Sequence, residues 1–440
     1  MRSYFEELVR ATCAPGAGLD RISLSLEAEQ SQFLRFNRAR VRQSTAVEQR
    51  YATVSVVAAA RRASATVTLS GALAADQALL LAERDALASS LEAIPDDPYL
   101  LLPDTVTDTQ YEQRGRCPEA AEIVAAVAAQ AADLDLVGLY AGGPVVRAHG
   151  DSRGQCNWHC VERFQFDWSL VHAADRAVRA HHGGTHWDGA AFAQSMETAR
   201  ERLALLAQPH AALAPGAYRV LLSPQAVVEL LGTLSWGGFG LKALRTGVSS
   251  LVRLHRGEAM LHPQVVLTET SAAGLAPQFQ ADGFVKPESV PLVRAGRAAQ
   301  TLVSPRSGRE YAVPTNGCNA QEAPEALHLA PGTLPEADAL RVLDTGLYLS
   351  HLHYLNYSDR QACRITGMTR FACFRVQGGR LAEPIGVMRF DDSLLRMLGP
   401  GLVGLTDRAV TVPSAMSYGA RQLRSITAPG ALVEDFRLTL

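Results

Sequence analysis

Two histidines have the residue types and the spacing that a ligand or metal site uses. His351 and His353 are two residues apart, and residues two apart on a β-strand project from the same face of the sheet. Both rings could converge on one ligand, and Cys363 lies further along the chain, where a hairpin would bring it opposite them. This trio leaves open a stand-alone hydrolase with its own metal site. The simpler interpretation is two histidines that face a cavity or the surface without a metal.

Three other segments match chemical motifs only in part. The Cys-Asn-Trp-His-Cys sequence at 156–160 has no second cysteine pair nearby, as a structural zinc site would need, so we interpret it as ordinary strand and loop residues. His181, His182 and His186 form a histidine-rich patch that we interpret as a solvated loop. Residues 399–404 match GxGxxG, but the residues that follow look extended rather than helical, which favours a turn-rich loop over a dinucleotide site.

The motif of the common zinc peptidases is absent. Those enzymes place two histidines one helical turn apart, with a glutamate beside the first that activates the metal-bound water. The chain has 12 histidines, and none is followed by glutamate. GxSxG and Walker motifs are absent as well. We therefore expect no catalytic residues and no metal ligands of this type in the chain itself.

The elements that must position these residues fall into two parts. In the first part, residues 21–70 alternate apolar and polar side chains, which is typical of an antiparallel meander. The segments 134–146 and 150–168 also look like strands. Helices are predicted over 2–13, 72–93, 118–133 and 190–206.

The second part is predicted to be largely β. The proline-flanked segment 209–215 reads as a linker, and residues 224–234 read as one helix. After about residue 257, short apolar runs alternate with Gly, Pro and Asp, as in β domains with long connections. We therefore predict an α+β fold with an N-terminal domain of strands and helices at 1–212 and a mostly β domain at 213–440.

Charge and composition limit the classes of partner. Lys+Arg is 42 and Asp+Glu is 44, for a formal net charge of -2, so we expect no direct contact with nucleic acid. No apolar stretch approaches the length of a membrane helix, and the first residues do not look like a signal peptide. The seven cysteines are scattered and do not resemble a disulfide framework. A cytoplasmic protein is the expectation.

A series of segments in the second half resembles the TldD/PmbA family of peptidase subunits, once called modulators of DNA gyrase. The strongest match runs from Asp344 to Phe390: a strand, a polar turn, the sequence Thr-Gly-Met-Thr-Arg at 366–370, a second strand, a Gly-Gly turn and a third strand. Weaker matches lie at 217–228, 247–250 and 282–284, and in the N-terminal meander.

The resemblance implies a subunit type. TldD-like chains carry HExxxH on a helix and a late cysteine that bind zinc, whereas TldE/PmbA-like chains lack both. Here the corresponding helix reads Val-Val-Glu-Leu-Leu-Gly-Thr-Leu at 227–234, and no cysteine follows Leu405. The chain is therefore expected to be a TldE/PmbA-like subunit of a heterodimeric zinc metallopeptidase, with zinc supplied by a TldD-like partner.

The resemblance also implies a substrate and a set of contact residues. We expect an unstructured peptide to lie in a cavity between the subunits, and we predict that five residues face it: His351, His353, Tyr354, Thr369 and Arg370. Arg370 could pair with a peptide carboxylate or with an acidic residue across the interface, or it could only brace its hairpin. A homodimer of the chain alone and a peptide-binding scaffold without peptidase function remain the alternatives.

Overall fold

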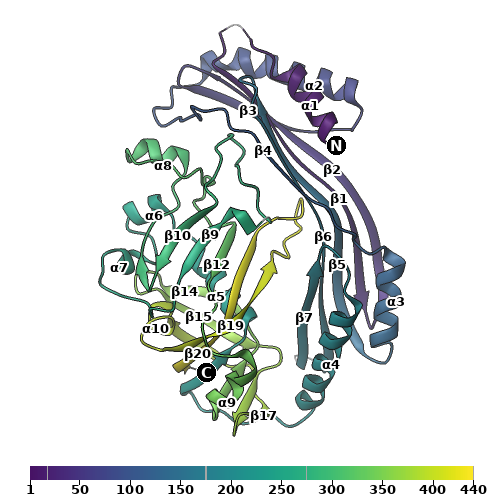
Figure 1. The fold of residues 1–440 in the computed structure, drawn as a ribbon, viewed down its shortest axis with the longest axis vertical. Coiled ribbons are helices and arrows are strands. Elements are labelled where there is room, and N and C mark those ends of the chain that lie inside the picture. The colour runs from purple at the N-terminus through teal and green to yellow at the C-terminus, as the bar shows by residue number, and fades with distance from the viewer. Residues whose placement is uncertain (17, 174–175, 274, 440) are drawn as a thin grey trace.

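The computed structural model describes residues 1–16, 18–173, 176–273 and 275–439. Two β-sheets organise these residues (Figure 1). A seven-stranded sheet is built from strands between Arg21 and Gly184, and a 13-stranded sheet from strands between Gly216 and Leu438. The predicted α+β fold class is confirmed. The boundary near residue 212 stays a prediction.

The first sheet is mostly antiparallel, with strand order β3-β2-β1-β5-β6-β4 and β7 paired to β6. The predicted meander and the two strands predicted at 134–146 and 150–168 are present as long strands. Their bounds are β1 (Arg21–Asn37), β2 (Arg40–Ala58), β3 (Arg61–Thr68), β4 (Thr109–Gln113), β5 (Asp135–Asp151), β6 (Cys156–Ala173) and β7 (Arg176–Gly184).

The period-two pattern gives this sheet two different faces. On β1 the buried Ile22, Leu24 and Leu26 alternate with polar side chains, because successive side chains point to opposite faces. Four helices cover the apolar face, two at each end of the long strands (Figure 1). They are α1 (Arg2–Thr12), α2 (Leu73–Ser90), α3 (Ala120–Ala131) and α4 (Gly189–Leu206).

Local capping explains where two of these helices begin. Glu119 and Glu122 form a reciprocal capping box at the start of α3, and the Asp188 carboxylate accepts the first backbone N–H groups of α4. Such caps satisfy donors that have no partner within the helix. The helix starts that the sequence indicated lie within two residues of these positions.

The second sheet has the order β11-β10-β9-β12-β20-β8-β13-β16-β17, with β14, β15, β18 and β19 branching from it. Its central strands are β8 (Gly216–Leu222) and β20 (Ser425–Leu438). The others are β9 (Leu267–Thr270), β10 (Ser289–Arg294), β11 (Arg297–Ala298), β12 (Ala326–Leu329), β13 (Gly346–Leu349), β14 (His351–Asp359), β15 (Arg364–Arg370), β16 (Phe374–Gln377), β17 (Arg380–Pro384), β18 (Arg389–Ser393) and β19 (Leu402–Pro413).

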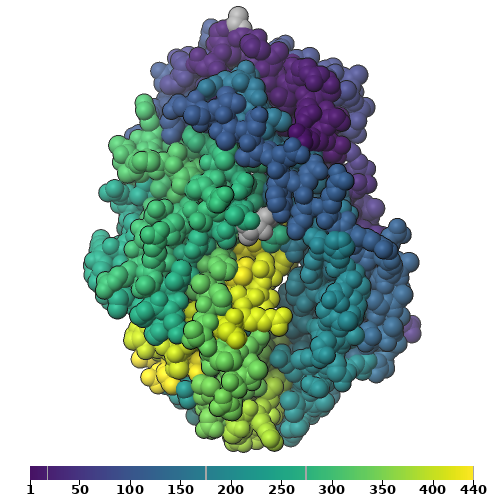
Figure 2. Space-filling view, viewed as in Figure 1, coloured from purple at the N-terminus to yellow at the C-terminus, as the bar shows by residue number. Residues whose placement is uncertain are grey.

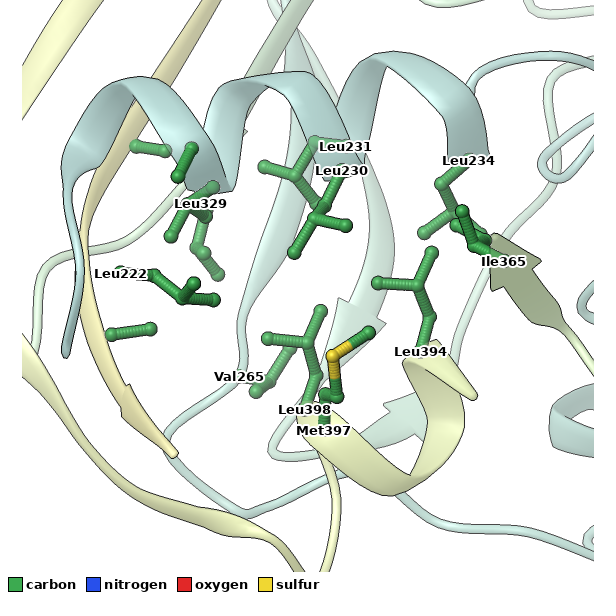
Figure 3. Close-up of a cluster of buried hydrophobic side chains, with 14 of the residues drawn as sticks. Leu222, Leu230, Leu231, Leu234, Val265, Leu329, Ile365, Leu394, Met397 and Leu398 are labelled. Carbon is green, nitrogen blue, oxygen red and sulfur yellow. The ribbon is translucent and has the colours of Figure 1, made fainter. Parts of the chain in front are cut away.

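Helix α5 (Pro224–Leu234) is the main helix of the second half. Ser223 caps its first turn, and Pro224 occupies the first helical position, where no backbone donor is needed. Its leucines point into a core shared with β8, β15 and the short helix α10 (Leu394–Met397), as Figure 3 shows for Leu230, Leu231 and Leu234. The remaining helices are short: α6 (Leu241–Arg245), α7 (Val252–His255), α8 (Pro305–Glu310) and α9 (Ala339–Leu343).

The two halves meet along the helix-free face of the first sheet. The Arg62 guanidinium on β3 pairs with Asp282, and the Ser25 hydroxyl on β1 donates to the carbonyl of Ala281. In the space-filling view, yellow atoms of the C-terminal strands lie beside the teal atoms of the first half (Figure 2). No helix among the described residues is long and apolar enough to cross a membrane.

One interpretation from the sequence needs correction here. His181 and His182 are not in a solvated loop but on β7. The His182 ring packs against Trp187 at 4.7 Å between ring centroids and against Phe164, and burial lowers its pKa. The strand was missed because its residues are short or basic and carry little apolar alternation. His186 lies just beyond β7 and is exposed.

Candidate functional site

The β14–β15 hairpin carries all five predicted contact residues. Its register places His351 opposite Arg370, Leu352 opposite Thr369 and His353 opposite Met368. The pairing is antiparallel, so the first residues of β14 and the last residues of β15 lie together at one end of the hairpin. This end faces β7 of the first half, because Arg179 of β7 lies over the ring of Phe371, the residue that follows β15.

His351 is buried at this end. Its ring meets the ring of Phe371 edge-on at 5.1 Å between centroids, and its Nδ1 lies 3.2 Å from the hydroxyl of Ser350. Burial first, and then the nearby arginine charges, lower its pKa to about 3. The imidazole is therefore neutral at physiological pH and has the character of a fixed packing group.

His353 and Tyr354 are exposed, and their rings lie 4.2 Å apart. A bulge follows: Tyr354 has a positive φ of 52°, and the pairing shifts so that Asn356 lies opposite Thr366. Bulges redirect side chains and are common next to functional sites. Partial burial, and then the charges of Arg370 and Arg179, lower the pKa of His353.

The Thr-Gly-Met-Thr-Arg sequence holds the hairpin in shape. The Thr369 side chain is buried, and its hydroxyl accepts the backbone N–H of Met388 at 2.9 Å. A Cβ on Gly367 would lie 2.6 Å from the Leu355 side chain and 2.8 Å from the Phe390 ring. Only glycine fits there without movement of its neighbours. Thr369 and His351 are thus buried in the chain by itself, whereas His353, Tyr354 and Arg370 are accessible.

Phe371 is the centre of a basic cluster. The guanidinium carbons of Arg179 and Arg370 lie 5.8 and 5.4 Å from the centre of its ring. Phe371 has a φ of 62°, a conformation that a bulky residue rarely adopts. Within the described part of the chain, no carboxylate lies within ion-pair distance of Arg179, Arg202 or Arg370.

A carboxyl group of α5 completes this end of the hairpin. The carboxylate of Glu229 accepts the backbone N–H of Leu352 and a bond from the Gln225 amide at 3.3 Å. Burial raises its pKa to about 7, against the stabilising effect of these bonds and of the Arg179 charge. The group can therefore gain or lose a proton near neutral pH.

The alternative metal site of His351, His353 and Cys363 is wrong. The hairpin register places Arg370 and Met368 across from the two histidines. Cys363 precedes Arg364 at the far end of the hairpin and is fully buried. Elsewhere in the described residues, too, no three His, Cys, Asp or Glu side chains come together as a metal site requires.

The other two partial motifs are structural. Residues 156–160 lie on β6, where His159 stacks on Tyr111 at 5.0 Å and burial lowers its pKa to about 4. The glycine-rich segment 399–404 runs directly into strand β19 rather than into a helix. Both interpretations from the sequence are confirmed.

Sequence reasoning missed Arg179, Phe371 and Glu229. Phe371 directly follows the Thr-Gly-Met-Thr-Arg sequence, and Glu229 is a lone acid within an apolar helix, so both carried a signal. Arg179 carried none, because it reaches the site from a strand of the other half.

Comparison with known proteins places this geometry in a family. Residues 215–440 match the model of the PmbA/TldA metallopeptidase C-terminal domain, which spans the hairpin, α5 and the whole second sheet. The chain belongs to the PmbA/TldA metallopeptidase family. None of the curated proteins matches it significantly.

Solved structures of the PmbA/TldA fold extend the likeness to the first half. TldE from Thermococcus kodakarensis superposes with a TM-score of 0.78 at 11% identity, over 99% of this chain and 100% of that one. A protein described as a modulator of a DNA gyrase from Thermotoga maritima gives 0.77 at 13% identity, over 99% of both chains. A similarly described protein from Bacteroides thetaiotaomicron gives 0.69 at 12% identity, over 99% and 98%. At such identities the likeness establishes the fold alone.

Proposed function

We propose that the chain is a non-catalytic, TldE-like subunit of a heterodimeric zinc metallopeptidase that degrades or trims unstructured peptides. Its TldD-like partner supplies the zinc. In this proposal the chain closes one side of the peptide cavity and contacts the substrate through the accessible residues of the β14–β15 hairpin.

The observation that carries the proposal is the composition of α5 in a member of a metallopeptidase family. Where the TldD-like subunits have metal-binding histidines, this helix has apolar residues, and Val227, Leu230 and Leu231 are fully buried in the core. The one acid in that stretch, Glu229, is held by Leu352 and Gln225. A side chain that packs in a core cannot coordinate a metal ion. The likeness to a protein named TldE supports the same subunit type.

Co-expression tests the proposal. A tagged form of this chain is expressed with a TldD-like chain that carries HExxxH, and cleavage of an unstructured peptide is measured for each chain and for the mixture. We expect co-purification, cleavage only in the mixture, and loss of cleavage on chelation of zinc.

Two results would overturn the assignment. One is cleavage by the isolated chain after metal removal. The other is a stable homodimer that neither binds the zinc-bearing chain nor changes its activity, which would favour the scaffold function instead.

A further inference from the structure

A cavity of about 600 Å³ lies next to the basic cluster, on the helix-free face of the first sheet. Paired residues of neighbouring strands form its floor: Arg35 pairs with Leu139, and Leu139 pairs with Asp167. Arg179 lines the cavity as well as contacting Phe371. Arg179 therefore belongs to both the cavity and the basic cluster.

Apolar side chains form part of the cavity lining. Phe33, Val137 and Leu139 line it, and both Val137 (40%) and Leu139 (39%) are unusually exposed for aliphatic strand residues. Ser417, at the tip of the β19–β20 hairpin, lines the opposite side. Covering exposed aliphatic side chains of a concave site with an apolar ligand side chain is favourable, because it removes apolar surface from water.

The charges around this cavity do not balance. Arg35 and Arg179 line it, and Arg370 lies at the same Phe371 ring as Arg179. None of these three arginines has a carboxylate within ion-pair distance among the residues that the structure describes. The one acid of the floor, Asp167, is bound to His181 at 3.2 Å. Clustered guanidinium groups repel one another, so an anion between them would be stabilised.

The backbone conformation of Phe371 is energetically unfavourable. Its positive φ is unfavourable for a bulky residue, and the two arginines that contact its ring carry like charges. Bidentate contact of a carboxylate with arginine is among the strongest polar contacts in proteins. Arg179 and Arg370, each within 5.8 Å of the centre of the Phe371 ring, offer donors for such a carboxylate.

We propose that this site binds the free C-terminus of a peptide that ends in an apolar residue. The α-carboxylate lies between Arg179 and Arg370, and the last side chain enters the cavity beside Arg179. The inference names the substrate class for the peptide-binding role and so rests on the proposed function. It gives the subunit without zinc a task of its own, the choice of peptide ends.

The test uses the full chain alone, with no partner and no zinc. Binding of a fluorescent peptide ending in leucine with a free carboxylate is compared with binding of the same peptide as a C-terminal amide. A third peptide is an amide that ends in aspartate. We expect the free acid to bind about tenfold or more tightly than either amide.

Variants locate the effect. R179Q and R370Q are each expected to reduce the affinity for the free acid to about that for the amide. The matched control is R294Q, at the end of β10, which lies on the other side of the second half from β7 (Figure 1). It should change nothing. L139S should reduce the preference for a final leucine over a final glycine without removing the preference for the acid.

Several results would overturn the inference: equal binding of acid and amide, undetectable binding of the free acid at millimolar peptide, or unchanged selectivity in both arginine variants. Equally tight binding of the aspartate amide would also overturn it, because the site would then bind a side-chain carboxylate as well as the C-terminal α-carboxylate. Since the readout needs no partner, failure to co-purify with a zinc-bearing chain affects the proposed function alone. Cleavage in the mixture combined with equal binding of acid and amide would remove this inference alone.

Discussion

Glu229 shows how a single buried group can make stability depend on pH. Its ordinary pKa is 4.5, and burial against α5 and β14 raises it to about 7 in the folded chain. Between pH 4.5 and about 7, the carboxyl group is therefore protonated in the folded state and ionised in the unfolded state. This group's contribution to stability is fully present below pH 4.5, decreases as the pH rises, and is lost above about 7.

Replacing Glu229 by glutamine should remove that dependence. The uncharged amide keeps the size of the side chain but loses one acceptor oxygen. Above pH 7 we expect the free energy of unfolding of E229Q to be about 1–2 kcal/mol higher than that of the wild type. At pH 4.5 this advantage should be gone. Urea denaturation at both pH values measures the difference, and a constant difference between them would contradict the assigned pKa.

At the scale of elements, the β19–β20 hairpin joins the two halves. Its connecting segment lies across the first sheet, where the buried Arg421 guanidinium donates to the carbonyls of Gly143 and Arg163 and to the hydroxyl of Ser31. Burial lowers the pKa of Arg421. Three acceptors from three strands thus hold one side chain of the hairpin in place.

Loss of this contact should loosen the hairpin. R421Q cannot reach all three acceptors, so we expect residues 412–426 to exchange amide hydrogens at least about tenfold faster than in the wild type. Hydrogen exchange followed by mass spectrometry measures this. The matched control is R424Q, since Arg424 lies on the same hairpin but is exposed. Similar acceleration in both variants would mean that Arg421 is not the anchor.

At the scale of the whole molecule, one hydrophobic core crosses from the first half to the second. Phe374 and Ala372 of the second half are buried in a cluster with Phe36, Phe166 and Phe192 of the first. Phe374 also begins β16, a strand of the second sheet. Both halves therefore depend on the same buried contacts.

The shared core predicts cooperative unfolding. F374A should reduce the free energy of unfolding by about 3–5 kcal/mol and shift one calorimetric transition that includes both halves. F436A, in a core confined to the second half, should shift that same single transition. Two separate transitions, with F436A moving only one of them, would show that the halves unfold independently.

The sequence by itself determined the elements whose signals are local. Period-two alternation marked β1 to β3, the predicted ranges of α3 to α5 agree with the structure within two residues, and the residues from Asp344 to Phe390 were enough to indicate the family. These features depend on neighbours within a few residues, so they can be recognised in the sequence alone.

Only the tertiary structure decided which distant residues meet. The register of β14 with β15 separates Cys363 from His351, and the approach of β7 brings Arg179 to Phe371 and raises the local positive charge. The burial that gives Glu229 a pKa near neutral likewise arises from packing between α5 and β14. Pairing register, burial and charge balance depend on contacts between segments far apart in the chain, and local sequence patterns do not specify them.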